Sequence, residues 1–536
     1  MWQILDYLKK GNSPQKLTIF TRKKKIYLLI RFKRETQLAV SVDGLNFKKT
    51  EISKKILKYF SKNEKRKIID KYIYESSLAP GSEHLNIHDL TIEKDIKTKD
   101  GILLFYHHHK DGKIEVGTLI TDVTDPGKVR WRHNQPVWES PNDWKNKNPT
   151  FIDLVKTSRR YIAYWWLKKT GLFAITYPKY KIEKQIEIKQ KHYLHKIPNN
   201  PIIAPKAKNG WEAFTTFNPA AIYESDKVHI LYRAQGFDYK SILGYANSTN
   251  GTHITERQSY PAYIPGEAFE KKHSHPKGGK KRKRTLQKYM SGGGCEGCED
   301  PRITRIGNKI YMTYVAFNGY NPPRIALTSI KLENFLAKRW LWKKPILISP
   351  PEIVDKSACI LPEKINNKYV IFHRIFPNIL IDFVDNLEFK KDEYLKGEYK
   401  ITPRSPMWWD SRKIGVGAPP LKTKEGWLMI YQAVDDKNSG HYKVGAMLLD
   451  LKNPTKVLHR SLHPIIEPSQ WYENDGFKAG VVYPCGAVII EKQLFVYYGG
   501  ADSYVCVATA SLDQFLQQLK EQKDSKLEST YIGQVA

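Results

Sequence analysis

Short runs of apolar residues that alternate with polar ones recur along the whole chain, and most of them read as β-strands. Lys309–Phe317 (KIYMTYVAF) and Leu494–Gly500 (LFVYYGG) are examples, rich in Tyr, Val and Phe. Runs of this kind, bounded by Gly, Asn or Pro, are typical of strands joined by turns. One segment, 52–72, has helical spacing instead, with lysines on its outer face. The pattern therefore predicts an all-β protein with little helix.

After residue 200 these runs form a repeat. Each copy has a proline near its start, two apolar runs separated by a charged or Asn/Gly turn, and a further apolar run behind them. The five copies are 218–234, 299–317, 361–374, 418–434 and 483–500, and their prolines are Pro219, Pro301, Pro362, Pro419 and Pro484. A spacing of 57–82 residues suits a four-stranded blade with its loops, so we predict a five-bladed β-propeller. The first strand of each blade would line a central channel, where residues far apart in sequence would share one pocket.

Three more pairs of apolar runs precede the repeat, in 17–47, 101–123 and 150–177. A Lys- and Gln-rich stretch, 181–196, follows them and is typical of a linker. We therefore expect an N-terminal β-rich domain at 1–195, a propeller at 196–520 and a C-terminal tail at 521–536. Whether the first domain is itself built from propeller-like blades stays open.

The chain is strongly basic, with 88 Lys and Arg against 55 Asp and Glu and a net charge of +33. Such a charge often accompanies nucleic-acid binding. The lysines are spread over the whole chain, however, and the sequence has no helix-turn-helix, zinc-finger or RNA-binding signature, so a nucleic-acid partner is not expected. The basic run 271–284 (KKHSHPKGGKKRKR) is predicted to be a solvated loop, with an anion-attracting rim of a pocket as the alternative.

The sequence also bears on the compartment. No stretch of about 18 continuous apolar residues is present, and the first residues turn polar too early for a signal peptide. The five cysteines are few for a chain of 536 residues, which argues against a secreted disulfide scaffold. We therefore expect a cytoplasmic protein without a membrane segment.

Two groups of histidine and cysteine invite a metal-binding interpretation. Cys295 and Cys298 form a CxxC, and His273 and His275 precede it. About twenty residues of basic loop intervene and no second CxxC exists, so we expect no metal site there. The triplet 107–109 (HHH), at the end of a predicted strand, is expected to be a surface feature.

The segment Gly292–Arg305 (GGGCEGCEDPRITR) gathers glycines, two adjacent carboxylates and arginine in front of a strand. Neighbouring strand residues point to opposite faces, so at most one of Glu299 and Asp300 faces a channel, and the other could pair with Arg302. An ion pair that holds the loop is the simpler interpretation. Asn218, Arg233 and Asp502, in other copies of the repeat, would meet the same channel.

One acid among several cations suggests a particular chemistry. Glycosidic cleavage requires a general acid for the leaving oxygen and a nucleophile for the anomeric carbon, and the nucleophile is ordinarily provided through a second carboxylate. If inorganic phosphate is the nucleophile, Arg and Lys should take the place of that carboxylate. Arg324, Arg374 and Lys413 are candidates.

Several longer motifs resemble glycoside hydrolase family 130, the β-mannoside phosphorylases and hydrolases. These are GCEDPRIT, LYRA at 231–234, KIGVGAPPLKTKEGW at 413–427, and VVYPCG with LFVYYGGAD in 481–502. The resemblance extends from about residue 200 to 516 and is carried by several ordered motifs. It implies a five-bladed propeller that converts β-mannosides and phosphate into mannose 1-phosphate with inversion, without a cofactor.

The resemblance also implies roles for single residues. Asp300 would be the general acid, acting through a hydroxyl of the bound mannose. Asn218, Arg233 and Asp502 would hold the sugar to be transferred, and the residues facing phosphate would be Arg324, Lys413, His373, Arg374 and Gln432. Gln432 departs from the family pattern, because phosphorylases often have His there, and Gln can donate a hydrogen bond but carries no charge.

Two alternatives stay open at this level. A β-mannoside hydrolase would use the same fold with water in place of phosphate, although Lys413 and Arg324 favour a phosphorylase. A propeller that only binds carbohydrate or nucleic acid would explain the many aromatic residues and the positive charge. The partners expected are an oligosaccharide and phosphate, and the resemblance is compatible with a homo-oligomer.

Overall fold

The fold is described from a computed structural model of the chain. It describes residues 15–179, 194–521 and 529–534, with gaps at 32–35, 46, 52–89, 99–100, 111–112, 122, 124–128, 133–135, 145–148, 168–170, 272–293, 405–407 and 436–438. The predicted helix at 52–72 and nearly all of the basic run 271–284 lie outside the described residues. The chain divides into two compact units, one formed by 1–191 with 523–536 and the other by 192–522.

The described part of the chain is nearly all β, which confirms the predicted class. Helix in the described ranges is limited to short pieces: α5 (Leu332–Leu336), α6 (Trp471–Asn474), α7 (Leu512–Glu521) and the 3-10 turns Asn142–Trp144 and Gly210–Glu212. No helix among the described residues has the length and apolar character needed to cross a membrane.

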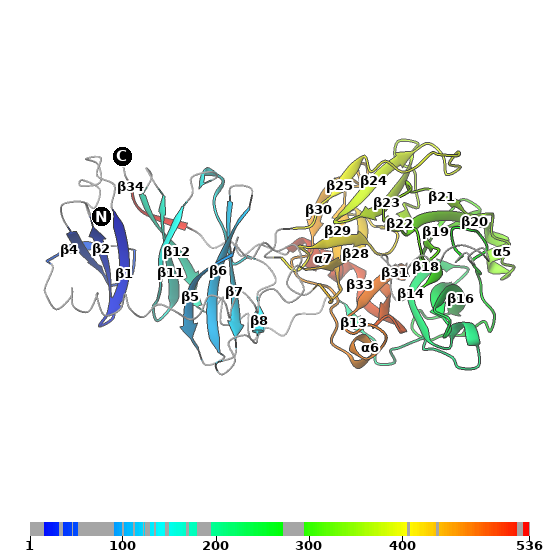
Figure 1. The fold of residues 1–536 in the computed structure, drawn as a ribbon, viewed down its shortest axis with the longest axis horizontal. Helices are drawn as coiled ribbons and strands as arrows, with labels where there is room; N and C mark the ends of the chain where they lie inside the picture. The colour runs from blue at the N-terminus through cyan, green and yellow to red at the C-terminus, as the bar shows by residue number, and fades with distance from the viewer. Residues whose placement is uncertain are drawn as a thin grey trace, which may run out of the picture. The chain divides into compact units, whose positions relative to one another are not determined.

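The described residues of the first unit form three antiparallel sheets (Figure 1). One contains β1 (Lys16–Arg22), β2 (Lys25–Arg31), β3 (Thr36–Ser41) and β4 (Lys48–Thr50), and the second contains β5 (Leu90–Lys97), β6 (Ile102–Lys110), β7 (Lys113–Thr121), β8 (Val129–Arg132) and β9 (Trp138–Glu139). The third contains β10 (Thr150–Lys156), β11 (Arg160–Leu167), β12 (Gly171–Pro178) and β34 (Ser529–Gln534). The segment predicted as a C-terminal tail thus provides a strand to this unit.

His107 of β6 corrects one prediction. It was expected on the surface with its two histidine neighbours, but it is buried and its ring lies 5.2 Å from that of Trp165, edge to face. Burial lowers the pKa of His107 to about 4, so the ring is neutral at physiological pH. The prediction was wrong because the apolar residues before it, Ile102–Tyr106, continue one buried strand through His107.

In its described part the second unit contains five antiparallel sets of strands, numbered here along the chain (Figure 1). Sets one and two are joined into one sheet by a short parallel pairing of 240–241 with 296–297. Set one is β14 (Thr215–Glu224), β15 (Lys227–Gln235), β16 (Lys240–Ser248) and β17 (Glu256–Arg257), and set two is β18 (Glu296–Ile306), β19 (Lys309–Phe317), β20 (Arg324–Lys331) and β21 (Ile346–Leu347). Set three is β22 (Lys356–Ile360), β23 (Tyr369–Ile375), β24 (Asn378–Val384) and β25 (Tyr399–Ile401). Set four is β26 (Lys413–Val416), β28 (Trp427–Val434), β29 (Lys443–Leu449) and β30 (Val457–Arg460), with β27 (Leu421–Lys422) beside β28. Set five is β31 (Val482–Ile490), β32 (Gln493–Gly500), β33 (Tyr504–Ser511) and β13 (His195–Lys196).

The first strands of the sets lie next to one another. β14 contacts both β18 and β31, β18 contacts β22, and β22 contacts β26. Arg302 of β18 crosses between them, because its side chain donates to the carbonyl oxygens of Gly417 at 3.0 Å and Val416 at 3.3 Å and reaches the Tyr483 hydroxyl at 3.5 Å. This buried guanidinium therefore connects sets two, four and five.

Set five is completed by the strand that comes first in this unit. β13 pairs with β33, and the side chain of Asn200 makes two hydrogen bonds to the backbone of Val507, at 2.8 and 2.9 Å. Lys196 donates to the buried carboxylate of Glu473 at 2.6 Å, which also accepts from the Tyr498 hydroxyl at 2.9 Å. The two ends of the unit are joined in one sheet.

The number of repeats predicted from the prolines agrees with the five sets, but the predicted starts of two repeats do not coincide with the first strands. Pro219, Pro301 and Pro484 lie within the first strands of sets one, two and five. Pro362 and Pro419 instead follow the first strands of sets three and four. The third set therefore begins at Lys356, because the buried Ile360 and Leu361 end its first strand instead of opening it.

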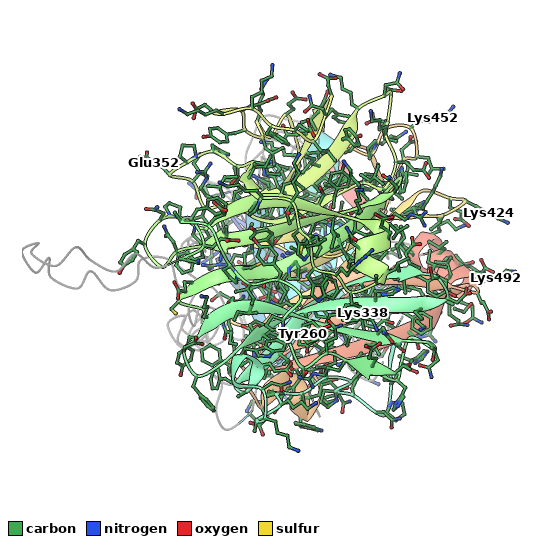
Figure 2. All side chains as sticks on the ribbon, turned by 90° about the vertical axis from the view of Figure 1, so that its right-hand side faces the viewer. Tyr260, Lys338, Glu352, Lys424, Lys452 and Lys492 are labelled. Carbon is green, nitrogen blue, oxygen red and sulfur yellow. The ribbon has the colours of Figure 1, made fainter. Side chains whose placement is uncertain are left out.

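Exposed lysines are distributed around this unit. Lys424, Lys452 and Lys492 come from three different turns and project outward from its rim (Figure 2). Their side chains are solvated, as expected for a charge that is spread along the sequence.

Candidate active site

One extra residue in the first strand positions the central polar side chains in each of sets one, two and three. The pairing with the second strand shifts between Phe217 and Ala220, between Glu299 and Arg302, and between Lys356 and Cys359. The residues at these bulges, Asn218, Asp300 and Ser357, have φ of +47°, +52° and +55°. Asn and Asp tolerate this left-handed conformation better than most residues, and the proline that follows each of them lacks the N–H that a regular strand would need to pair. The motifs NP and DP thus favour the bulge locally.

Asp300 is at the centre of a buried hydrogen-bonded group. Its Oδ1 accepts from Asn218 Nδ2 at 2.7 Å and from the Arg233 guanidinium at 3.0 Å. Arg233 also donates to Glu299 Oε1 at 2.9 Å and to the Ser241 hydroxyl at 3.0 Å, and its guanidinium carbon lies 4.6 Å from the centre of the Phe217 ring. Three residues predicted to share a pocket, Asn218, Arg233 and Asp300, are therefore in direct contact.

Two glycines allow these contacts. A Cβ on Gly294 would lie 2.7 Å from both the Arg233 guanidinium and the Glu299 carboxylate, and a Cβ on Gly499 would lie 2.2 Å from Asn218 Oδ1. Both glycines are therefore needed for the close approach of backbone to polar side chains.

The two carboxyls nearest the centre have opposite pKa shifts. Burial opposes ionisation of Asp300, but the charges of Arg233 and Arg302 outweigh it and hold the pKa of Asp300 below its usual value. Burial raises the pKa of Asp502 to about 6, against the charges of Lys478 and Arg233 and together with the charges of Asp300 and Glu299. Near neutral pH the site therefore holds a firmly ionised Asp300 beside a more weakly acidic Asp502.

Cations gather on set three and set four. Lys356 and Arg374 are cross-strand partners, and the charge of Arg374 acts on both Lys356 and Lys413. Burial lowers the pKa of Lys356 to about 8 and also lowers the pKa of Lys413. Lys413 Nζ donates to the Tyr442 hydroxyl at 2.6 Å. We call Lys356, Arg374, Lys413 and Tyr442 the cation cluster.

Tyr442 responds to these charges. Burial alone would raise its pKa, yet Lys413, Lys478 and Arg374 lower the pKa of Tyr442 to about 8. A phenol with a lowered pKa marks a strongly positive potential. The carboxylates of set two thus lie close to the cation cluster, since the charges of Glu299 and Asp300 also act on Lys356.

Gln432 lies beside this cluster. Its amide nitrogen donates to the Ser357 hydroxyl at 3.0 Å and to the Tyr483 hydroxyl at 3.1 Å, while its buried Oε1 has no hydrogen-bond partner among the described residues. A Cβ on Gly415 would lie 2.4 Å from the Gln432 amide nitrogen and 3.0 Å from Arg374 Cδ. Gln432 and Arg374 are therefore packed over the same glycine.

His373 has a different environment from the one predicted. It is fully buried between two aspartates, with Nδ1 2.7 Å from Asp355 and Nε2 2.9 Å from Asp382. Burial opposes its charge, but the two carboxylates raise the pKa of His373 to about 9. Both ring nitrogens are occupied, so neither can donate to a phosphate. His373 and Arg374 are neighbours on one strand and point to opposite faces, which sends only Arg374 toward the cluster.

Arg324 is bonded away from the cluster. Its guanidinium donates to the Ser349 carbonyl oxygen, at 3.0 Å from Nε, and lies 5.2 Å from the centre of the Tyr394 ring. Arg324 is not among the largest influences on the pKa values of Lys356, Lys413 and Tyr442.

Lys356 and Tyr442 were not predicted from the sequence. The sequence pattern places the start of the third copy of the repeat at Leu361. Lys356 and Ser357 then fall outside the copy, although their strand pairing makes them equivalent to Glu299 and Asp300. An alignment of Lys356–Ile360 (KSACI) with Glu299–Ile303 (EDPRI) reveals Lys356. Tyr442 gives no comparable signal, since it precedes a third strand as an ordinary aromatic residue.

The cysteines of the CxxC are separate thiols. Cys298 is buried in a hydrophobic cluster, whereas the Cys295 thiol lies 3.3 Å from the Asp238 carbonyl oxygen. Burial raises the pKa of the Cys298 thiol well above its ordinary value. Within the described residues no group of three His, Cys, Asp or Glu side chains has the arrangement of a metal site.

The second unit matches a known protein family. A sequence model of glycoside hydrolase family 130, described as beta-1,4-mannooligosaccharide phosphorylase, matches residues 193–521. This range corresponds to the second unit, and the first unit lies outside it.

Characterised relatives are similar over the same part of the chain. The 1,2-beta-oligomannan phosphorylase of Thermoanaerobacter sp. (strain X514) is 37% identical over 325 residues, 59% of this chain and 96% of the relative. The beta-1,2-mannobiose phosphorylase of Listeria innocua is 31% identical over 54% of this chain and 72% of its own. The beta-1,4-mannooligosaccharide phosphorylase of Ruminococcus albus is 28% identical over 41% of this chain and 64% of its own.

Among solved structures, the beta-1,2-mannobiose phosphorylase of Listeria innocua in complex with beta-1,2-mannobiose has a TM-score of 0.48 at 24% identity. It covers 61% of this chain and 99% of the solved chain.

The raised pKa of Asp502 predicts a pH-dependent effect of Asp502→Asn on stability. A carboxyl with a higher pKa in the folded than in the unfolded chain makes the protein lose stability as pH rises from about 4 to about 6. A rise from 3.8 to about 6 corresponds to about 3 kcal/mol. We expect the variant to unfold at a higher temperature than the wild type at pH 8, by calorimetry, and at nearly the same temperature at pH 4.

Asp385→Asn is the matched control, because this carboxylate is 81% exposed in its ion pair with Lys368. It should change the unfolding temperature little at either pH. A stabilisation by Asp502→Asn that is equal at pH 4 and pH 8 would contradict the assignment.

Proposed function

Because the chain belongs to glycoside hydrolase family 130, we propose that it cleaves β-mannosides with inorganic phosphate, releasing mannose 1-phosphate and a shortened sugar. The observation that carries the proposal is the division of the site into a carboxylate side, with Asp300 and Asp502, and a cation cluster. The named activities of relatives at 31–37% identity support it.

We further propose that the five sets form a five-bladed β-propeller, with the domain boundaries near 195 and 520. Support comes from the neighbouring first strands and from the contact of β14 with β31, which would close a ring. The channel mouth would then lie where Asn218, Asp300, Ser357 and Lys413 occur, near the starts of first strands.

The carboxylate side would bind the mannose to be transferred. Asn218, Arg233 and Asp502 would hold its hydroxyls. Asp300 uses Oδ1 for Asn218 and Arg233, and the described residues place no hydrogen-bond donor on its Oδ2, which is the oxygen available to substrate. Asp300 would supply a proton to the leaving oxygen through a hydroxyl of the mannose. A phosphate dianion bound nearby would raise the pKa of Asp300 and so favour its protonated form.

The cation cluster would bind phosphate. An oxygen of hydrogen phosphate would attack the anomeric carbon from the face opposite the leaving oxygen. As that bond forms, the bond to the leaving oxygen breaks and the oxygen takes its proton, so the configuration inverts. Lys356, Arg374 and Lys413 provide positive charge where a hydrolase would need a carboxylate base. The Tyr442 hydroxyl would orient the anion. Gln432 and His373 would not contact it, because the Gln432 amide nitrogen donates to Ser357 and Tyr483 and both His373 ring nitrogens are bonded to aspartates.

The linkage can be proposed from the relatives. Relatives that share 31–37% identity with this chain are named for β-1,2-linked substrates, whereas two relatives named for 4-linked β-mannosyl substrates share 28% and 22%. We propose β-1,2-mannosides as the preferred substrate. Cytoplasmic location, the absence of a nucleic-acid partner and homo-oligomer formation remain predictions.

Incubation of the purified chain with β-1,2-mannobiose, with and without phosphate, tests the function. We expect mannose 1-phosphate and mannose in equal amounts, only when phosphate is present, and slower turnover of β-1,4-mannobiose. Mannose release at the same rate without phosphate would establish a hydrolase instead.

Replacement of the proposed acid should separate binding from turnover. Asp300→Asn keeps the shape of the side chain and should lower kcat by about 10²- to 10⁴-fold, because the proton donor is removed. Binding of β-1,2-mannobiose, measured by calorimetry, should persist. Glu425→Gln, which changes a partly exposed carboxylate on the outer turn of set four, is the control. Normal turnover by Asp300→Asn would exclude this role.

The cation cluster makes a prediction about phosphate alone. Arg374→Gln removes a charge that can bind phosphate and should raise the KM for phosphate about 10- to 100-fold, while the KM for the mannoside changes little. Arg305→Gln, on an exposed ion pair with Glu224, is the matched control and should change neither value. Equal changes in both KM values would contradict a phosphate-specific role.

A further inference from the structure

Four aromatic rings gather on one surface of the second unit. The Phe214 ring lies 5.7 Å from that of Phe237, 5.1 Å from that of Tyr239 and 5.5 Å from that of Phe477, measured between ring centroids. Phe237, Tyr239 and Phe477 are 73%, 39% and 40% exposed. We call these four residues the aromatic surface. A group of exposed apolar side chains of this kind often marks an interaction site.

The aromatic surface is attached to the three segments that carry the carboxylate side of the site. Phe214 immediately precedes β14, the strand of Asn218. The Tyr239 carbonyl accepts from the Cys295 backbone at 3.1 Å, at the start of the strand of Asp300. The Phe477 backbone donates to the Ser503 hydroxyl at 2.7 Å, one residue from Asp502. The rings therefore lie on segments that adjoin the strands or turns of Asn218, Asp300 and Asp502. The residue after Phe477, Lys478, reaches the cation cluster, with Nζ 4.9 Å from the centre of the Tyr442 ring.

Within this surface the rings are held by one another and by the backbone. Phe214 is partly buried and contacts all three exposed rings, so it acts as their common support. Tyr239 and Phe477 also lie 6.3 Å apart. The Thr216 backbone donates to the Ser503 carbonyl at 3.1 Å and so ties the β14 side of the surface to the Phe477 side. The exposed ring faces are thus preorganised, which lowers the entropic cost of binding.

We propose that the aromatic surface binds the acceptor end of an oligomannoside, the sugar units beyond the bond that is cleaved. The proposal rests on the proposed function. The mannose to be transferred needs the buried carboxylates and Arg233, so the remaining sugars must extend outward past the residues next to them. The C–H faces of pyranose rings are apolar and match exposed aromatic faces, while their hydroxyls stay in water.

The reverse reaction tests this surface, because it separates the two substrates. Rates of oligosaccharide synthesis from mannose 1-phosphate and β-1,2-mannobiose would be measured for Phe237→Ala, Phe477→Ala and the double variant. We expect the KM for the acceptor to rise about tenfold in each single variant and further in the double variant. The KM for mannose 1-phosphate should stay within about twofold, since that sugar lies on the carboxylate side.

Tyr399→Ala is the matched control. Tyr399 is 49% exposed on β25, the last strand of set three, and its ring contacts that of Phe383. This variant loses a similar exposed ring and should leave both KM values unchanged. Unchanged acceptor KM in the double variant, or equal increases for both substrates, would overturn the proposal. A change of oligomeric state in the double variant without a change in acceptor KM would instead identify an interface between copies and also overturn it.

Direct binding distinguishes failure of this inference from failure of the proposed function. β-1,2-Mannotriose would be titrated by calorimetry into Asp300→Asn and into Asp300→Asn with Phe477→Ala, without turnover. Weaker binding by Asp300→Asn with Phe477→Ala than by Asp300→Asn alone supports the aromatic surface even if the wild type releases no mannose 1-phosphate. Equal binding by the two proteins rejects it even if the wild type is an active phosphorylase.

Discussion

A single additional residue in three neighbouring strands determines where the central side chains point. Because strand side chains alternate, a register shift of one position moves every following residue to the other face. The bulges at Asn218, Asp300 and Ser357 confine that shift to one place, so Arg302 can still pair in register while Asp300 is turned toward Asn218 and Arg233. The left-handed backbone at these positions is strained for most residues, which explains a short polar side chain at each of the three.

The carboxylate side of the site is compensated by a buried arginine, whereas the charges of the cation cluster are compensated less completely. Arg233 compensates two buried carboxylates, Glu299 and Asp300, at once. On the other side, Lys356, Arg374 and Lys413 repel one another, and the lowered pKa values of Lys356 and Lys413 reflect this together with burial. An anion with two charges would relieve the repulsion, and a neutral sugar beside Asp300 would not add to it. Bound phosphate would thus compensate positive charge of the cation cluster that the protein alone leaves uncompensated.

The sequence predicts the site best where one motif determines both the backbone conformation and the functional side chain. Asn218 and Asp300 stand in NP and DP motifs whose backbone preference and polar side chains point to the same position. The first strand of set three has no proline. The proline pattern therefore points to Pro362, which follows the strand, and gives no indication of Lys356. His373 illustrates a second limit. Its partner Asp355 immediately precedes β22 and its partner Asp382 lies in β24, and only the folded register shows that they occupy both ring nitrogens.

The position of β34 has a consequence for how the chain is made. β12 ends at Pro178 and its sheet neighbour β34 begins at Ser529, so the whole second unit is inserted between two adjacent strands of the first. During synthesis the first unit leaves the ribosome with the edge of β12 unpaired. The sheet of β10, β11 and β12 gains its fourth strand, β34, only after the second unit has emerged. Until then β12 presents open backbone groups, the feature through which unfinished sheets associate with other chains. Because β34 is translated last, the first unit can be completed only after the second unit has been synthesised.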